Sequence, residues 1–183
     1  MNKSHFTIFI DSSYNPDRKF GVGGFLCIPN CPDEVLVNKN ALEELYSPDV
    51  VKTRIVEHTT NTRLELQTLL WALESLRLDT ETKTSEEMGS ITVYTDCRTA
   101  VDLLRRRERL GRTHYLSKRK GTILGNADIY KGIFTLCDQL SPKLVWIKGH
   151  TSEKDRVGIQ KIFSEVDRFV RNLLRSYIAR KFS

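Results

Sequence analysis

"TTNTRLELQTLLWALESLRL" occupies residues 59–78, and the spacing of its leucines predicts an amphipathic helix. At about 100° per residue, Glu65 lies only about 40° from Leu69, on the side of the helix that faces the core. A carboxylate on a buried face needs a cationic partner, so the helix indicates a site as well as a core. The buried stripe is predicted to consist of Leu66, Leu69, Leu70, Leu73 and Leu76.

Three strands are predicted before this helix. A short apolar run near the N-terminus is followed by a turn containing Asn, Pro and Asp, and a second apolar run then forms its hairpin partner. The form of residues 29–51, which contain three prolines, is not determined by the pattern. The predicted strands are His5–Ile10, Val22–Ile28 and Thr53–His58.

Strands and helices alternate after the helix of residues 59–78. A strand at Ile91–Thr95 precedes a helix at about residues 98–107, and a later helix ends at Ser141-Pro142. A strand at Leu144–Ile147 and a long final helix complete the chain. This order predicts an α/β fold with a five-stranded mixed sheet, whose first three strands are antiparallel and whose flanks are helical.

The length and composition predict one domain spanning residues 1–183. The chain is 39% hydrophobic and 28% charged, and no apolar run approaches the roughly 18 residues that a membrane span needs. Its four cysteines are scattered, without the paired spacing of a zinc site, so we expect reduced thiols. We therefore expect a cytoplasmic protein that does not enter a membrane.

Positive charge is concentrated in one segment. Residues 105–120, RRRERLGRTHYLSKRK, hold eight Lys or Arg and one Glu, a net +7 in a chain whose total is +6. The remaining residues are nearly neutral. Clustered charge of this kind favours a polyanion such as nucleic acid, although a solvated helix end would look the same.

Four acids stand at comparable positions in the predicted elements. Asp11 and Asp96 each end a strand, Glu65 lies in the first helical turn, and Asp167 flanks the apolar stripe of the last helix, about 60° from Val170. Taken singly, Asp96 could cap a helix and Glu65 could favour a helix dipole. Taken together, hard oxygen ligands at one end of a sheet indicate two Mg²⁺ or Mn²⁺ ions and hydrolysis of a phosphodiester.

Five stretches in order resemble the type 1 ribonuclease H family, from Phe6 to about Arg175. The helix start resembles the family's T-N-x-R-x-E signature, and the other stretches resemble its first hairpin, a strand-to-helix junction, a W-[VI]-K-G-H loop and the final helix. They read TTNTRLEL, FIDSSYN…GVGGFL, VYTDCRTAVDLL, VWIKGHTSEKDR and SEVDRFVRNLLR. The resemblance implies the ribonuclease H fold and, as a rule, a monomer.

The resemblance also implies the chemistry of the site. Two Mg²⁺ ions, with Mn²⁺ as the alternative, would be held by four acids, and the RNA strand of an RNA–DNA hybrid would be cut to leave 3′-hydroxyl and 5′-phosphate ends. His150, on a loop, would help to expel product or move protons. The four acids are Asp11, Glu65, Asp96 and Asp167.

Substrate contacts follow from the same resemblance. Thr60 resembles a phosphate-pocket threonine, and Asn61 resembles a residue that touches sugar edges in the minor groove. The basic segment resembles a protrusion that grips the DNA strand. Its predicted contacts are Arg105, Arg106, Arg107, Lys118, Arg119 and Lys120.

The sequence departs from the family pattern at three places. Ser12 stands where members usually have glycine, residues 31–51 have no counterpart, and the longer stretch from 150 to 167 leaves Glu165 or Asp155 open as the fourth acid. Two other functions stay open as well. One is a non-catalytic module that binds hybrids or duplexes, and the other is a resolvase-like or transposase-like nuclease on the same fold.

Overall fold

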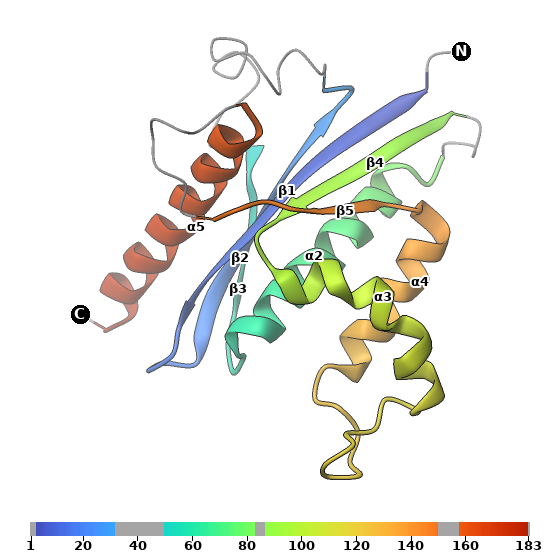
Figure 1. Cartoon of the computed structure of the whole chain (residues 1–183). Helices are drawn as coiled ribbons and strands as arrows, with labels where there is room; N and C mark the ends of the chain where they lie inside the picture. The colour runs from blue at the N-terminus through green and yellow to red at the C-terminus, as the bar shows by residue number, and fades with distance from the viewer. Residues whose placement is uncertain (1–2, 32–49, 83–86, 150–157, 183) are drawn as a thin grey trace.

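The computed structural model describes residues 3–31, 50–82, 87–149 and 158–182. Its five strands form one sheet in the order β3-β2-β1-β4-β5 (Figure 1). The antiparallel partners β1, β2 and β3 come first in the chain, and β4 and β5 run parallel to β1. The strands are β1 (Ser4–Asn15), β2 (Phe20–Pro29), β3 (Lys52–Val56), β4 (Met88–Thr95) and β5 (Lys143–Trp146).

Helices cover both faces of this sheet (Figure 1). One hydrophobic cluster joins β1 and β4 to α2, α3 and α4, and a second joins β1 and β2 to α5. The helices are α2 (Asn61–Asp79), α3 (Arg98–Arg112), α4 (Ala127–Leu140) and α5 (Gly158–Phe182). The predicted α/β fold with a five-stranded mixed sheet is therefore confirmed.

Strand β1 supplies side chains to both layers. Ile8 and Ile10 belong to the cluster under α2, whereas Phe9 belongs to the cluster under α5, and all three are almost completely buried. This is the period-2 alternation of a strand that is covered on both faces. It explains why residues 5–10 form a nearly continuous apolar run.

Strand β1 also extends beyond its predicted end. The prediction that it stops at Asp11 is wrong, because pairing with β2 continues from Asp11 opposite Gly24 to Asn15 opposite Phe20. The apolar run ends earlier than the strand does, because β1 has its last β4 partner at Phe9. Beyond that point polar side chains are tolerated.

Glycines in β2 allow both helices to approach the sheet. A Cβ atom on Gly21 would lie 2.5 Å from the Leu64 Cδ2 atom of α2, and one on Gly24 would lie 2.5 Å from the Val170 Cγ2 atom of α5. Helix α2 begins at Asn61 after the N-cap Thr60, whose hydroxyl accepts a hydrogen bond from the Arg63 amide at 3.3 Å. The cap and the glycines together fix the position of α2 on the sheet.

Two further expectations can be compared with the structure. The four cysteines, which all lie within the described residues, form no disulfide bond in the structure. Among the described residues, no helix combines the length and the hydropathy that crossing a membrane demands.

Replacement of Gly21 by alanine is expected to lower the free energy of unfolding by about 1–3 kcal/mol, because the new methyl group overlaps Leu64 and the Ser13 carbonyl oxygen. Gly111→Ala is the matched control, since no atom lies within 4 Å of its Cβ position and the residue is helical. That change should raise stability by about 0.5–1 kcal/mol. Urea unfolding of both variants measures the difference, and equal values would contradict the close packing.

Candidate active site

Asp11 and Asp96 are neighbours because of the β1–β4 register. The last parallel pair joins Phe9 to Tyr94, and each acid lies two residues beyond its member of that pair. Strand β4 ends at Thr95, so Asp96 leaves the sheet while β1 continues along β2. The Trp146 indole of β5 donates a hydrogen bond to the Asp96 carbonyl oxygen at 3.0 Å and fixes the backbone at this point.

Glu65 reaches the same place from α2. Because the helix begins at Asn61, Glu65 lies in its second turn, and the prediction that it lies in the first turn is wrong. The Asn61 side chain donates to Glu65 Oε1 at 2.9 Å, and the Cys97 thiol donates to Oε2, also at 2.9 Å. One small pocket brings three of the four acids together; it is lined by Ile10, Asp11, Ser12, Glu65, Thr68, Thr95 and Asp96.

Asp167 approaches Asp11 from α5, close enough for its charge to raise the pKa of the Asp11 carboxyl group. Asp167 also forms an ion pair with Arg171, one helical turn later. Glu165, the described alternative for the fourth acid, forms an ion pair with Arg168 instead. Asp155 and His150 lie outside the described residues.

The pKa of Asp11 is raised well above its ordinary value. The largest cause is burial, followed by the negative charges of Asp96 and then of Asp167. Ionised carboxylates at such close range need a compensating cation. A hard divalent ion is the group that this set of oxygen donors fits.

Two of the four acids form contacts with other side chains of the same chain. Among the residues that the structure describes, no three Asp, Glu, His or Cys side chains are grouped as metal ligands. The reason lies in the contacts given above: Glu65 is held by Asn61 and Cys97, and Asp167 is held by Arg171.

The helix that follows Asp96 is capped by another residue. The N-cap of α3 is Cys97, whose sulfur accepts from the Ala100 amide at 3.4 Å, so the role of Asp96 as a cap is not observed. Burial, and then the hydrogen bond to Glu65, raises the pKa of the Cys97 thiol to about 12. Sequence reasoning missed this residue, although its position directly before a helix is a signal for a cap.

Gly149 is a second residue that sequence reasoning did not single out. A Cβ atom at this position would lie 2.5 Å from the Asp96 Oδ2 atom. The segment that leaves β5 therefore passes directly against the carboxylate. Only glycine leaves room for this approach, which explains the glycine within WIKGH.

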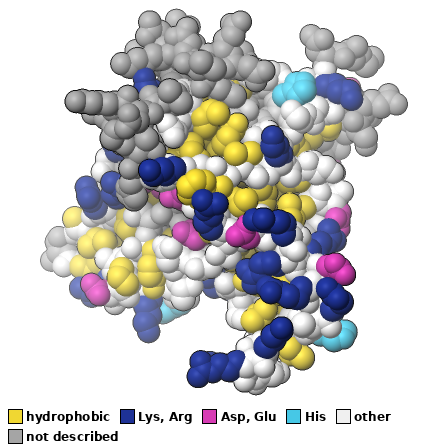
Figure 2. All heavy atoms as spheres, in the orientation of Figure 1, with side chains coloured by type: hydrophobic (Ala, Val, Ile, Leu, Met, Phe, Trp, Pro, Cys, Tyr) yellow, Lys and Arg dark blue, Asp and Glu magenta, His cyan; other side chains and the backbone are white. Residues whose placement is uncertain are grey.

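The predicted basic contacts fall into two groups. Arg105 pairs with Asp102, and Arg107 donates two hydrogen bonds of 2.5 and 2.6 Å to Asp138, so these side chains have partners within the fold. Arg106 is half-buried in α3. Lys118, Arg119 and Lys120, on the loop between α3 and α4, are exposed, as are Arg105 and Arg107 on α3. Figure 2 shows Lys and Arg side chains gathered over α3 and the loop that follows it.

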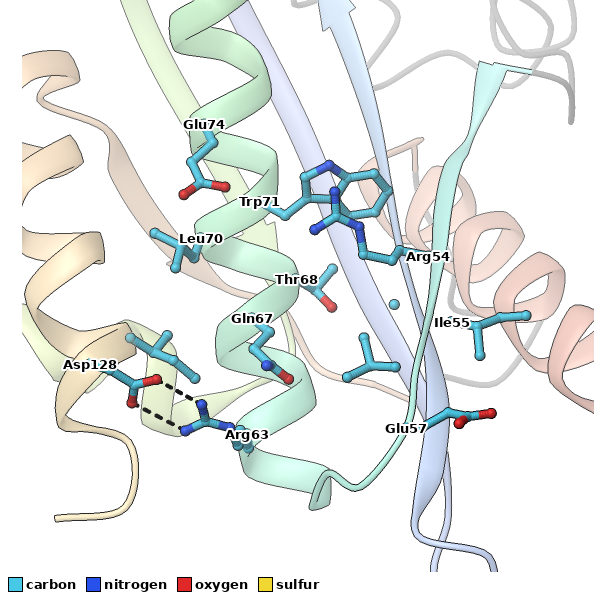
Figure 3. A pocket seen from close by; sticks show the side chains of 13 residues that line it. Arg54, Ile55, Glu57, Arg63, Gln67, Thr68, Leu70, Trp71, Glu74 and Asp128 are labelled. Atoms are coloured by element: carbon cyan, nitrogen blue, oxygen red, sulfur yellow. Dashed lines mark hydrogen bonds and ion pairs between the residues drawn. The ribbon is translucent and has the colours of Figure 1, made fainter.

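A larger hollow of about 470 Å³ lies between α2, β3 and α4 (Figure 3). The Arg54 guanidinium lies over the Trp71 ring there, 4.6 Å from the ring centroid. Arg63, from the TTNTR stretch, donates to both carboxylate oxygens of Asp128 at 3.2 and 2.7 Å. None of the four acids lines this hollow, so Arg63 joins α2 to α4 and does not belong to the acidic pocket.

Comparison with known proteins agrees with the fold and identifies the family. A crystal structure described as LC9-RNase H1, a type 1 RNase H with the type 2 active-site motif, superposes with a TM-score of 0.65 at 16% identity, covering 96% of this chain and 74% of that one. No curated protein matches the sequence significantly. The family model for RNase H matches residues 3–172, almost the whole chain, and the protein therefore belongs to the RNase H family.

Proposed function

We propose that the protein is an endonuclease that hydrolyses the RNA strand of RNA–DNA hybrids and leaves 3′-hydroxyl and 5′-phosphate ends. Asp11, Glu65, Asp96 and Asp167 hold two Mg²⁺ ions in this proposal, with Mn²⁺ as the alternative. Family membership supports the reaction class. The acids support the mechanism.

One observation carries the proposal: the half-buried Asp11 carboxyl group lies close to two further acids that come from different elements. Burial and the charges of Asp96 and Asp167 raise its pKa, so an ionised Asp11 is costly without a nearby cation. A protein that needed these residues only for stability would gain by replacing one of them. The presence of three acids at one place is explained if they bind cations.

Each residue has a defined task. Two divalent ions, when bound, activate the attacking water and stabilise the leaving oxygen of a phosphodiester. Asp11 is fixed by the pairing of β1 with β2, which continues through this residue, and Asp96 directly follows the end of β4. Asn61 and Cys97 restrain Glu65, and Gly149 keeps the loop that leads to His150 close to Asp96.

Recognition of the hybrid is assigned to the rim of this pocket. Asn61 offers a donor and an acceptor for sugar edges, and the hydroxyl of Thr60 is already used as the cap of α2. The exposed charges after α3 supply non-specific attraction to phosphates. Arg105 and Arg107, which have acidic partners, contribute less to this attraction than Lys118, Arg119 and Lys120.

Replacement of Asp96 by asparagine is expected to lower kcat by roughly 10³-fold or more, because an anionic ligand is lost while the shape is kept. Hybrid affinity should change little. The assay mixes the purified protein with labelled RNA–DNA hybrid and Mg²⁺, with double-stranded DNA and double-stranded RNA in parallel. Asp79→Asn, an exposed acid at the end of α2, is the control.

The same assay separates the alternatives. Binding of hybrid without any product by the unaltered protein would favour a non-catalytic module. Preferred cleavage of double-stranded DNA would favour a resolvase-like enzyme. Full activity of Asp96→Asn would contradict the metal assignment.

Replacement of Asp11 by asparagine should stabilise the fold at pH 7 in EDTA. The pKa of Asp11 is higher in the folded state than its ordinary value of 3.8, so its ionisation costs stability above that pH. We expect Tm to rise by roughly 3 °C or more, as about 1 kcal/mol gives in a chain of this size. The gain should disappear as the pH falls towards 4, and a lower Tm at pH 7 would contradict it.

Replacement of Lys118, Arg119 and Lys120 by alanine should weaken hybrid binding and flatten its dependence on salt. The slope of log K against log salt is expected to fall by about 0.9 for each phosphate that the protein no longer neutralises. Cleavage at saturating hybrid should be retained. Alanine at Arg175 and Arg180, two exposed charges near the end of α5, serves as the control and should leave the slope unchanged.

A further inference from the structure

Ser12 has a buried hydroxyl group that lacks a partner. Its Oγ atom is inaccessible to solvent and forms no hydrogen bond with the described residues. A hydroxyl removed from water without compensation is costly, because it loses its bonds to water and gains none. Such a group in a native fold therefore requires a reason.

The position of Ser12 supplies the reason. Ser12 follows Asp11 in β1 and pairs with Gly23, and it lines the small pocket that also contains Asp11, Glu65 and Asp96. Ser12, which carries this hydroxyl group, therefore belongs to the wall around the carboxylates. The side chains of Glu65 and Asp167 have protein donors, whereas the Ser12 hydroxyl has none among the described residues.

We propose that the Ser12 hydroxyl is a further, uncharged oxygen donor of the divalent-cation site formed by the four acids. The inference rests on the proposed function, since it takes those acids as the ligands. A hydroxyl oxygen is a hard donor that suits Mg²⁺ and Mn²⁺. It also adds no negative charge to a pocket that already contains several carboxylates.

This role has an energetic signature that a purely structural serine would lack. Removal of the hydroxyl relieves an unsatisfied polar group in the metal-free protein, so the fold should lose no stability. The same removal deprives a bound cation of a donor, so its affinity should fall. For the variant without the hydroxyl, we thus expect cation affinity to fall while stability rises or stays constant.

The test titrates the protein with Mn²⁺ alone, without substrate. Electron paramagnetic resonance measures the fraction of Mn²⁺ that is bound. Ser12→Ala should bind Mn²⁺ about tenfold more weakly than the unaltered protein, the size of effect known for residues that support a metal site. Its Tm in EDTA should be equal or higher. Ser13→Ala, the neighbouring residue of the strand, is the matched control and should keep full affinity.

Each result has one meaning. Equal Mn²⁺ affinity of Ser12→Ala and the unaltered protein overturns the inference, and so does a loss of affinity that comes with a lower Tm in EDTA. A protein that binds Mn²⁺ through Ser12 but cuts no hybrid would leave the inference in place and refute the nuclease. If the protein cuts hybrid and Ser12→Ala binds Mn²⁺ as tightly as the unaltered protein, the nuclease proposal stands and the inference about Ser12 is refuted.

Discussion

The rest of the structure depends on one constraint, the repulsion among carboxylates at the point where β1 continues beyond its last pair with β4. Asp11 and Asp96 stand two residues past the last shared pair, and Asp167 adds its charge from the opposite layer. Proteins seldom bury like charges together, because the charged forms lose hydration and repel each other. Here two strands and two helices hold these charges close together in the folded protein.

The sheet achieves this by being closely covered on both faces. The glycines of β2 allow α2 and α5 to pack directly on the backbone, and β1 carries apolar side chains to both layers in strict alternation. The run of polar residues from Asp11 to Ser13 follows the point where β1 loses its β4 neighbour. The same strand therefore contributes to the core through residues up to Ile10 and to the pocket through Asp11 and Ser12.

Much of this arrangement could be predicted from the sequence, for identifiable reasons. Apolar periodicity located the strands and helices, because two-sided burial makes β1 and β4 apolar and the leucine stripe defines α2. The acids were found because they interrupt that periodicity. Strand ends were less predictable, since β1 continues through polar residues by backbone pairing alone. Contacts that depend on exact geometry, such as Cys97 with Glu65 and Gly149 against Asp96, have no periodic signature.

The placement of Asp167 on α5 makes the pocket a joint product of both layers. Asp11, Glu65 and Asp96 line it together, whereas Asp167 reaches Asp11 from a helix whose apolar residues belong to the other cluster. Secondary elements can detach from a folded protein in cooperative units at less cost than global unfolding. A transient undocking of α5 would remove the fourth acid while the layer that holds the other three stayed folded. The set of four acids is thus complete only while α5 is packed on the sheet. The activity of the enzyme therefore depends on the docking of its last helix.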